Sequence, residues 1–278
     1  MMDWPEALLD AQLLLWREFL PAWCAALTAA LTLPLIGTQM AFRGQALVTL
    51  AMPQASFAAM AIALALPWLG SADEPSVAVT LGAAFVGALL GGLAASRGAP
   101  ALSALRMGAV FVLAWATTEV ARTLSPVGET QLEPLLHGEL LGATRETAGI
   151  VTLLLLPAFL VLLQHRRLVF CAAFPDAAQA AGYSVANANR LLALLVAAAV
   201  TLGTVALGPL VTTAFLLLPA AQTARRAPSA RAMLLRSVVC AVLAALTGSV
   251  LSVLADIPLG AAIAVACVPA GLALRLFR

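Results

Sequence analysis

Charged side chains are scarce in this sequence, and lysine is missing altogether. Only 10% of the 278 residues are charged, 63% are hydrophobic, and the mean hydropathy is +1.01. A soluble domain of this length needs a charged surface, which so few ionic groups do not supply. Apolar stretches of roughly 20 residues, enough to cross about 30 Å of hydrocarbon, recur along the chain instead. The sequence therefore predicts a polytopic helical membrane protein without a second, soluble domain.

Several chemical signatures are also missing. No GxxxxGK[ST] loop occurs, and without lysine none can form, so this chain does not use nucleotide by that route. HExxH, GxSxG and paired carboxylates are missing too, which speaks against an intramembrane enzyme. The four cysteines have no CxxC spacing and are expected to be small core residues. We expect no enzymatic activity, no cofactor and no nucleic-acid partner.

The apolar runs predict an all-α bundle of about eight or nine transmembrane helices. Gly208 and Pro209 break the longest run, and Pro219 interrupts the following span one turn before its end. Broken helices line transport pathways, although proline kinks also serve plain packing. Gly87 and Gly91 are better explained by close helix packing. The candidate spans are 19–37, 47–70, 77–95, 105–124, 148–163, 191–207, 208–224, 237–254 and 260–275.

The arginines and the acids fall on opposite sides of the predicted membrane. If residues 38–46 are cytoplasmic, alternation gives the cytoplasmic segments most of the arginines and a single acid, Asp176. The positive-inside rule then places the N-terminus outside and the C-terminus inside, which requires an odd number of crossings. The arginines concerned are Arg43, Arg97, Arg106, Arg166, Arg167, Arg190, Arg225, Arg226, Arg231, Arg236, Arg275 and Arg278.

Two segments are expected outside the spans. Residues 1–17 have an acidic and an apolar face, which predicts an interfacial helix on the outer surface, although a frayed tail is the alternative. One transmembrane domain then covers 18–278. In "FPDAAQAAGYSVANANR" (174–190), Pro175 can begin a helix of about two turns and Gly182 can end it. This short helix would suit a soluble partner, whereas a solvated connector is the alternative.

Four stretches combine small and apolar residues with single charges or prolines: "LLHGELLGATRE", "FPDAAQAAG", "LVTTAFLLLPAAQTARR" and "DIPLGAAIAV". In this order they resemble parts of the membrane-spanning permease of ABC importers for zinc, manganese and iron. "LLHGELLGATRE" resembles its outer Leu-Phe-Gly-acid-Leu-Leu segment, with His137 where an aromatic is usual. "FPDAAQAAG" is similar to its cytoplasmic coupling segment, with Asp176, Ala180 and Gly182 at matching positions. "LVTTAFLLLPAAQTARR" resembles its run ending in Pro-Ala-Ala and a basic pair. "DIPLGAAIAV" is similar to its final Asp-Ile-Pro-Ser-Gly element, with Leu259 replacing serine.

A fifth stretch, "RGQALVTLAMPQA" (43–55), aligns with that family's Arg-Gly-x-Ala-Leu-x-x-Asp-Ala-x-x-His-Ala. The family's acid and histidine share one helix face and can hold a divalent cation. Leu50 and Gln54 stand in their places, and an amide is a poor zinc ligand. Either other groups hold the cation, or the solute is different or more complete, such as a chelated metal. Glu119 is one candidate ligand, unless it pairs with Arg122 on the same helix.

The resemblance covers the chain from about residue 19 and implies the permease subunit of an importer in a bacterial cytoplasmic membrane. Its solute would be a divalent metal ion, zinc or manganese, or a metal-containing solute. A second permease copy is implied, as a homodimer by default, with a heterodimer still open. Cytoplasmic ATPase subunits would dock on 174–189, where Asp176 would cap or orient the short helix.

An extracytoplasmic solute-binding protein would be received by an outer face that carries Glu133, His137 and Glu139. His137 and Glu139 are also candidate metal ligands, whereas His165 is expected to be part of the basic cytoplasmic edge. A secondary transporter of a small solute remains the alternative, as does a permease of this family with a non-metal substrate. Glu119 alone gives thin support for ion coupling.

Overall fold

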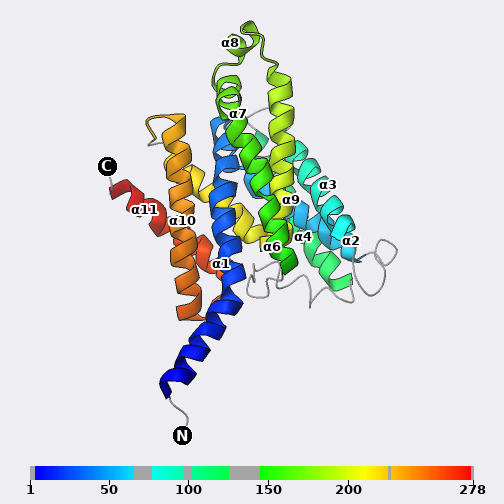
Figure 1. The fold of residues 1–278 in the computed structure, drawn as a ribbon. Helices are drawn as coiled ribbons and strands as arrows, with labels where there is room; N and C mark the ends of the chain where they lie inside the picture. The colour runs from blue at the N-terminus through cyan, green and yellow to red at the C-terminus, as the bar shows by residue number, and fades with distance from the viewer. Residues whose placement is uncertain (1–3, 66–76, 97–101, 125–144, 225–226, 277–278) are drawn as a thin grey trace.

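The computed structural model describes the chain apart from residues 1–3, 66–76, 97–101, 125–144, 225–226 and 277–278, and describes no side chains for 4–19, 145–148 and 275–276. The regular elements in the described residues are helices, so the all-α prediction is confirmed. In chain order they are α1 (Trp4–Phe42), α2 (Val48–Ala65), α3 (Val77–Ser96), α4 (Ser103–Leu124), α6 (Arg145–Leu153), α7 (Leu155–Ala173), α8 (Pro175–Ala180), α9 (Val185–Thr223), α10 (Ala230–Ala255) and α11 (Leu259–Leu276) (Figure 1).

The bundle consists mainly of helices that are long enough to span a bilayer. Among the described residues, seven helical segments have the required length and apolar character, and the shorter apolar helix Leu259–Leu274 accompanies them. The chain is therefore a multi-pass membrane protein. The predicted spans 77–95 and 105–124 agree with α3 and α4, whereas the predicted spans 191–207 and 208–224 are the two halves of α9.

The chain reverses its direction within α9, at Gly208. The backbone there has φ 81° and ψ 164°, a conformation that essentially only glycine adopts. A Cβ added to Gly203 would lie 2.9 Å from the Thr212 hydroxyl oxygen, although a straight helix would separate these residues by about 13 Å. The first half of α9 leads away from α8, and the second half returns toward the same end of the bundle (Figure 1).

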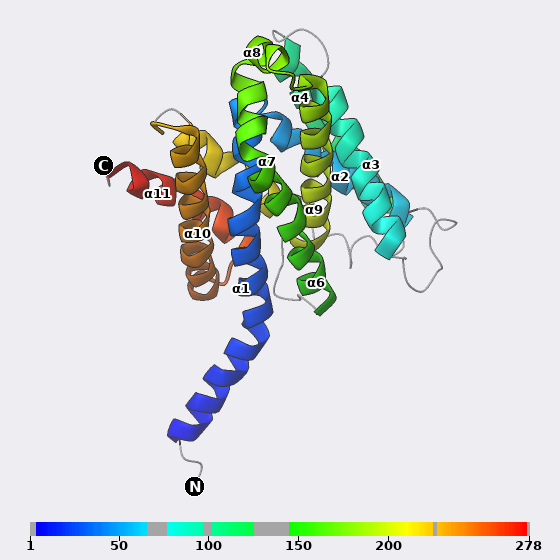
Figure 2. The same cartoon turned by 45° about the horizontal axis from the view of Figure 1, so that its top comes forward.

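The first helix is longer than predicted. We expected an interfacial helix over 1–17 and a separate span over 19–37, but α1 runs without interruption through both. Pro21 lies inside α1. The helix tolerates it because a proline removes a single backbone hydrogen bond, while the turns on either side keep theirs. The N-terminal part of α1 projects beyond the other helices, at the end opposite α8 (Figure 2). Its placement at a membrane surface stays a prediction.

The hairpin that carries α8 also extends further than predicted. The predicted span 148–163 ends too early, because α7 continues to Ala173, and α9 begins at Val185 instead of residue 191. Residues 164–173, which we expected in a connecting segment, are therefore helical. Arginine favours helix and its long side chain reaches water, so the helix persists past the apolar stretch. Consequently α8 sits at the tip of a helical hairpin (Figures 1 and 2).

The core of the bundle is formed by α1, α2 and α9. In the most apolar stretches of α2 and α9, 67% of the residues are buried, compared with 22% in α3 and α4. Helices α2 and α3 approach closely because a Cβ on Gly87 would overlap the Ala55 carbonyl, and one on Gly91 would overlap the Ala55 side chain. This confirms the packing interpretation of the two glycines. The Ser56 hydroxyl also donates to the Ala84 carbonyl at 2.9 Å.

We predict that Gly208→Ala destabilises the folded bundle by roughly 1–3 kcal/mol, because any other residue is strained at that backbone conformation. Gly82→Ala is the matched control, since Gly82 lies inside α3 and the added methyl group would enter open space. Thermal unfolding of the purified protein in detergent should show a lower midpoint for Gly208→Ala alone. Equal midpoints for both variants would contradict the reversal at Gly208.

Candidate functional site

The short helix α8 begins and ends where the sequence predicts. Pro175 occupies its first turn, and Gly182 follows its end with a φ of 82°. The Gly182 N–H donates to the Gln179 carbonyl and the Tyr183 N–H donates to the Ala178 carbonyl, both at 2.9 Å. This pair of bonds is the Schellman motif, which requires a left-handed residue at the position of Gly182.

The expectation that Asp176 caps α8 is wrong. Phe174 occupies the N-cap position and makes no side-chain capping bond, while Asp176 lies within the first turn. Its carboxylate can therefore act only through the partial positive charge of the helix N-terminus. Ala178 is fully buried, whereas Asp176 and Ala180 are exposed. The helix thus rests on Ala178 and leaves Asp176 and Ala180 accessible.

Aromatic side chains surround the turn that follows α8. The Phe170 ring lies 6.1 Å from the Tyr183 ring in an edge-on arrangement and 6.4 Å from the Phe174 ring. The Arg167 guanidinium lies 5.7 Å from the centre of the Tyr183 ring, within cation–π range. Phe174 and Tyr183 are nevertheless 62% and 43% exposed. Aromatic rings that neighbouring side chains fix in place, but that remain accessible, are typical of a surface that binds another protein.

Arg43 connects the α8 hairpin to the rest of the bundle. Its guanidinium donates to the Asn189 side-chain oxygen at 3.2 Å, to the Leu168 carbonyl at 3.1 Å and to the Gln39 carbonyl at 3.3 Å. These acceptors belong to α9, α7 and α1 respectively. Burial lowers the pKa of Arg43, an effect that Cys171 opposes, but an arginine stays protonated at pH 7. A single charge thus joins three helices at the base of the hairpin.

A second polar contact between α1 and α7 escaped the sequence analysis. The Gln39 side-chain nitrogen lies 2.7 Å from His165 Nδ1, and Gln39 is completely buried. His165 therefore does more than contribute to a basic edge, because it gives a buried amide its partner. The sequence feature that could have predicted this contact is the position of Gln39, an amide that lies just before the end of an apolar span and therefore needs a polar partner.

Leu50 and Gln54 lie on α2, in the interior of the chain. Gln54 is only 7% exposed and Leu50 is half-buried. The Gln54 side chain has no hydrogen-bond partner among the residues that the structure describes. An unpaired buried amide costs about 1–3 kcal/mol unless water or a solute meets it. No Gln54 atom is among the completely enclosed unpaired atoms, so the structure places an amide that keeps some access at the position that the resemblance assigns to the pathway.

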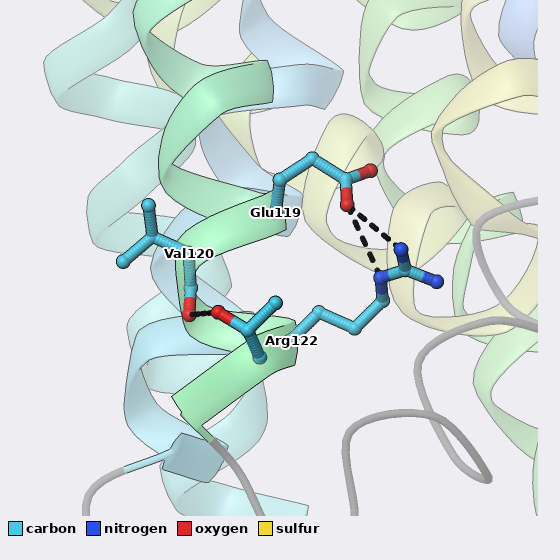
Figure 3. A network of polar contacts seen from close by, with 4 residues as sticks. Glu119, Val120 and Arg122 are labelled. Atoms are coloured by element: carbon cyan, nitrogen blue, oxygen red, sulfur yellow. Dashed lines mark hydrogen bonds and ion pairs between the residues drawn. The ribbon is translucent and has the colours of Figure 1, made fainter.

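Glu119 is paired within its own helix. Its carboxylate lies 3.0 Å from the Arg122 guanidinium, and the two side chains are partly exposed near the end of α4 (Figure 3). This is the ion pair that the sequence offered as the alternative to a ligand role. Among the described residues, the hydrogen bond and ion pair of Glu119 go to Arg122 and not to Gln54, so no polar interaction joins the two side chains into one site.

The two proline-containing sites in α9 differ. The Thr212 hydroxyl donates to the Gly208 carbonyl at 2.8 Å, next to Pro209, where the chain reverses. At Pro219 the helix continues to Thr223, so the predicted interruption there is wrong. The Thr223 hydroxyl donates to the Pro219 carbonyl at 2.9 Å, which stabilises the last turn. The irregular backbone is thus confined to Gly208.

The predicted outer face falls outside the part of the chain that the structure describes. Glu133, His137 and Glu139 all belong to that segment. Within the described ranges, no three side chains of histidine, cysteine, aspartate or glutamate lie together as a metal site would require.

The described residues thus form a multi-pass helical bundle with an accessible short helix at the tip of a hairpin and a helix that reverses at Gly208. The chain belongs to the ABC 3 transport family, which matches residues 17–276. It is the membrane-spanning permease subunit of an ABC importer, without an ATPase domain of its own.

Two solved structures share the fold. PsaBC from Streptococcus pneumoniae, solved in complex with a Fab, has a TM-score of 0.69 and 20% identity, covering 92% of this chain and 90% of that chain. An inward-facing transporter assigned to the metal-chelate type of ABC transporter has a TM-score of 0.68 and 17% identity, covering 96% and 90%. Comparison with curated proteins gave no match.

We predict that Gly182→Val uncouples ATP hydrolysis from transport, because a β-branched residue is strained at a positive φ and opens the turn after α8. Gly182→Asn should retain coupling, since asparagine tolerates that conformation. Ala177→Val is a control for bulk on exposed helical backbone. Uptake and ATP hydrolysis would be measured together in proteoliposomes. Normal uptake by Gly182→Val with the ATPase bound would show that residues 174–189 are only a connector.

Proposed function

We propose that this permease passes a divalent metal ion, zinc or manganese, or a metal-containing solute, and that separate ATPase subunits drive it from the α8 end. The importer family and its fold support the proposal. A secondary transporter would need an intramembrane ionisable group available for ion coupling. Glu119, the one acid inside a predicted span, is instead paired with Arg122. The ATP-driven importer is therefore the better account.

The contacts of Arg43 are the observation that carries the proposal. They connect α7 and α9, which flank α8, to the turn between α1 and α2. That turn is closed by bonds from the Gly44 N–H to the Ala41 carbonyl at 3.0 Å and from the Gln45 N–H to the Met40 carbonyl at 2.9 Å. A displacement of α8 by an ATPase would therefore reach the start of α2. Leu50 and Gln54 follow in the first two turns of that helix.

The orientation follows from the arginines. Arg43, Arg166, Arg167 and Arg190 all lie at the α8 end, which supports a cytoplasmic position for that end in a bacterial inner membrane. The N-terminus would then be outside and the C-terminus inside. ATPase subunits would bind the exposed surface of α8, including Asp176, Ala180 and Gly182. A second copy of the permease, as a homodimer, would complete the pathway.

The opposite face would receive a solute-binding protein. Glu133 and Glu139 give that face a negative charge to which arginine or lysine on the partner can bind. His137 lies between them in the sequence. These residues form the proposed outer docking face. Glu119 remains a weaker candidate for the pathway, because its carboxylate already has a partner in Arg122.

The chemistry of α2 limits how the solute is held. An amide oxygen and an alkyl group offer a bare cation no charge, and two copies in a dimer would not change this. A metal that enters with its own ligands would need no carboxylate or imidazole from the helix. The Leu50–Gln54 face therefore favours a metal-containing solute over a bare ion. The reversal at Gly208 and Pro209 supplies irregular backbone of the kind that lines pathways.

We predict that Gln54→Ala lowers transport by no more than about fivefold, the effect of one neutral polar contact of about 1 kcal/mol. Uptake of radioactive metal, alone or with a chelator, would be measured in cells with equal amounts of inserted protein. A near-total loss, with the protein still inserted and dimeric, would show that the amide is a primary contact and would overturn this prediction.

Leu50→Asp combined with Gln54→His should create a metal site, because the two ligands then share one helix face. We expect the purified double variant to retain zinc or manganese, at roughly one ion per dimer if four ligands converge. Each single substitution is the matched control, since it supplies only one ligand per chain. Metal content no higher in the double variant than in the singles would show that this face does not point into a shared pathway.

A further inference from the structure

A cavity of about 520 Å³ lies beside the α8 hairpin, between α2, α3 and the start of α9. It is separate from Gln54 and Glu119, which do not line it. Its walls come from the first turns of α2 and α9 and from the last turns of α3 and α7. The cavity therefore lies at the level where the membrane-spanning segments end. A volume of this size is in the range that holds a small organic ligand.

The lining is divided into a polar rim and an apolar interior. The rim lies where the helices end and consists of Arg43, Gln45, Ser96, Asn189 and Arg190. Two to seven residues away along the chain the wall is apolar, with Met52, Leu89, Leu93, Leu192 and Val196. None of the described lining residues is acidic. An amphipathic ligand with an anionic head fits this division.

The rim has donors to spare for an anion. Arg43 uses three of its five N–H groups in its bonds to Asn189, Leu168 and Gln39. Arg190 is exposed and has no partner among the described residues. Because Asn189 accepts from Arg43 through its oxygen, its amide N–H₂ is directed elsewhere and can donate. Two guanidinium groups and an amide can thus surround one phosphate.

The cavity is accessible from the side of the bundle. Leu93, in its apolar part, is 42% exposed, and neighbouring α3 side chains such as Leu90 are 61% exposed. An exposed apolar surface on a membrane-spanning helix can meet the acyl chains of the bilayer wherever no second copy of the chain covers it. A molecule can therefore keep its tails in the bilayer while its head enters the rim.

We propose that this cavity is a binding site for the headgroup of an anionic phospholipid. The phosphate binds Arg43 and Arg190, and the beginning of an acyl chain lies along Leu93 and Leu192. Basic pockets between transmembrane helices bind anionic headgroups in this way. Because Arg43 also joins α7, α9 and α1, the bound lipid would strengthen the base of the hairpin. The site does not depend on which solute is transported.

The test is lipid binding to the delipidated full-length chain in detergent, followed by native mass spectrometry. We expect retention of phosphatidylglycerol but not of phosphatidylcholine. Arg190→Gln should weaken phosphatidylglycerol binding by about tenfold or more, as expected for the loss of one charge-assisted contact. Ala193→Trp should abolish binding because it fills the cavity, which Ala193 lines. Arg166→Gln, at an exposed arginine that does not line the cavity, should leave binding unchanged.

Three results would overturn the proposal. Equal losses in Arg190→Gln and Arg166→Gln would show only general attraction to basic charge. Retention of phosphatidylcholine as strong as that of phosphatidylglycerol would show a purely apolar groove. Displacement of the lipid by inorganic phosphate at millimolar concentration, or by the ATPase subunit, would assign the rim to a soluble anion or to that partner.

Discussion

The hydrogen bonds of the Arg43 guanidinium hold together the part of the molecule on which the proposed mechanism depends. A lysine would bring the same charge but could not reach three acceptors on three helices at once. Two of these acceptors, on α7 and α9, lie on the hairpin that carries α8, and the third lies at the end of α1. Because Arg43 is followed directly by the turn into α2, the α8 hairpin and α2, which we propose to line the pathway, share one anchor.

The membrane imposes the other constraint, because buried backbone and side-chain polar groups must find partners within the protein. At the reversal in α9, the Thr212 hydroxyl gives the Gly208 carbonyl a partner. Gln39 satisfies this constraint only in part, because its amide nitrogen meets His165 while its buried side-chain oxygen has no partner in the described residues. The Gln54 amide also has no partner among the described residues, although its polar atoms are not among those that are completely enclosed, so water can meet it.

Much of the architecture could be predicted because apolar runs, glycine and proline act locally. The span positions, the two ends of α8 and the close packing at Gly87 and Gly91 all follow from such local rules. The helix ends that the sequence misplaced depend on contacts between elements that are distant in the chain. α1 continues through Pro21 and α7 continues past the apolar stretch, because packing and long arginine side chains sustain helix that composition alone does not. The Arg43 contacts join residues more than a hundred positions apart, which no spacing rule predicts.

The most direct test of this account is the ratio of solute imported to ATP hydrolysed by Arg43→Lys, measured with the ATPase subunits in proteoliposomes. The substitution keeps the charge at the base of the hairpin but removes the branched set of bonds. The account predicts continued ATP hydrolysis with a much reduced ratio, while Arg166→Lys, at an exposed arginine outside these contacts, keeps the normal ratio. An unchanged ratio in a correctly folded Arg43→Lys protein would contradict the claim that Arg43 transmits the movement of α8 to α2.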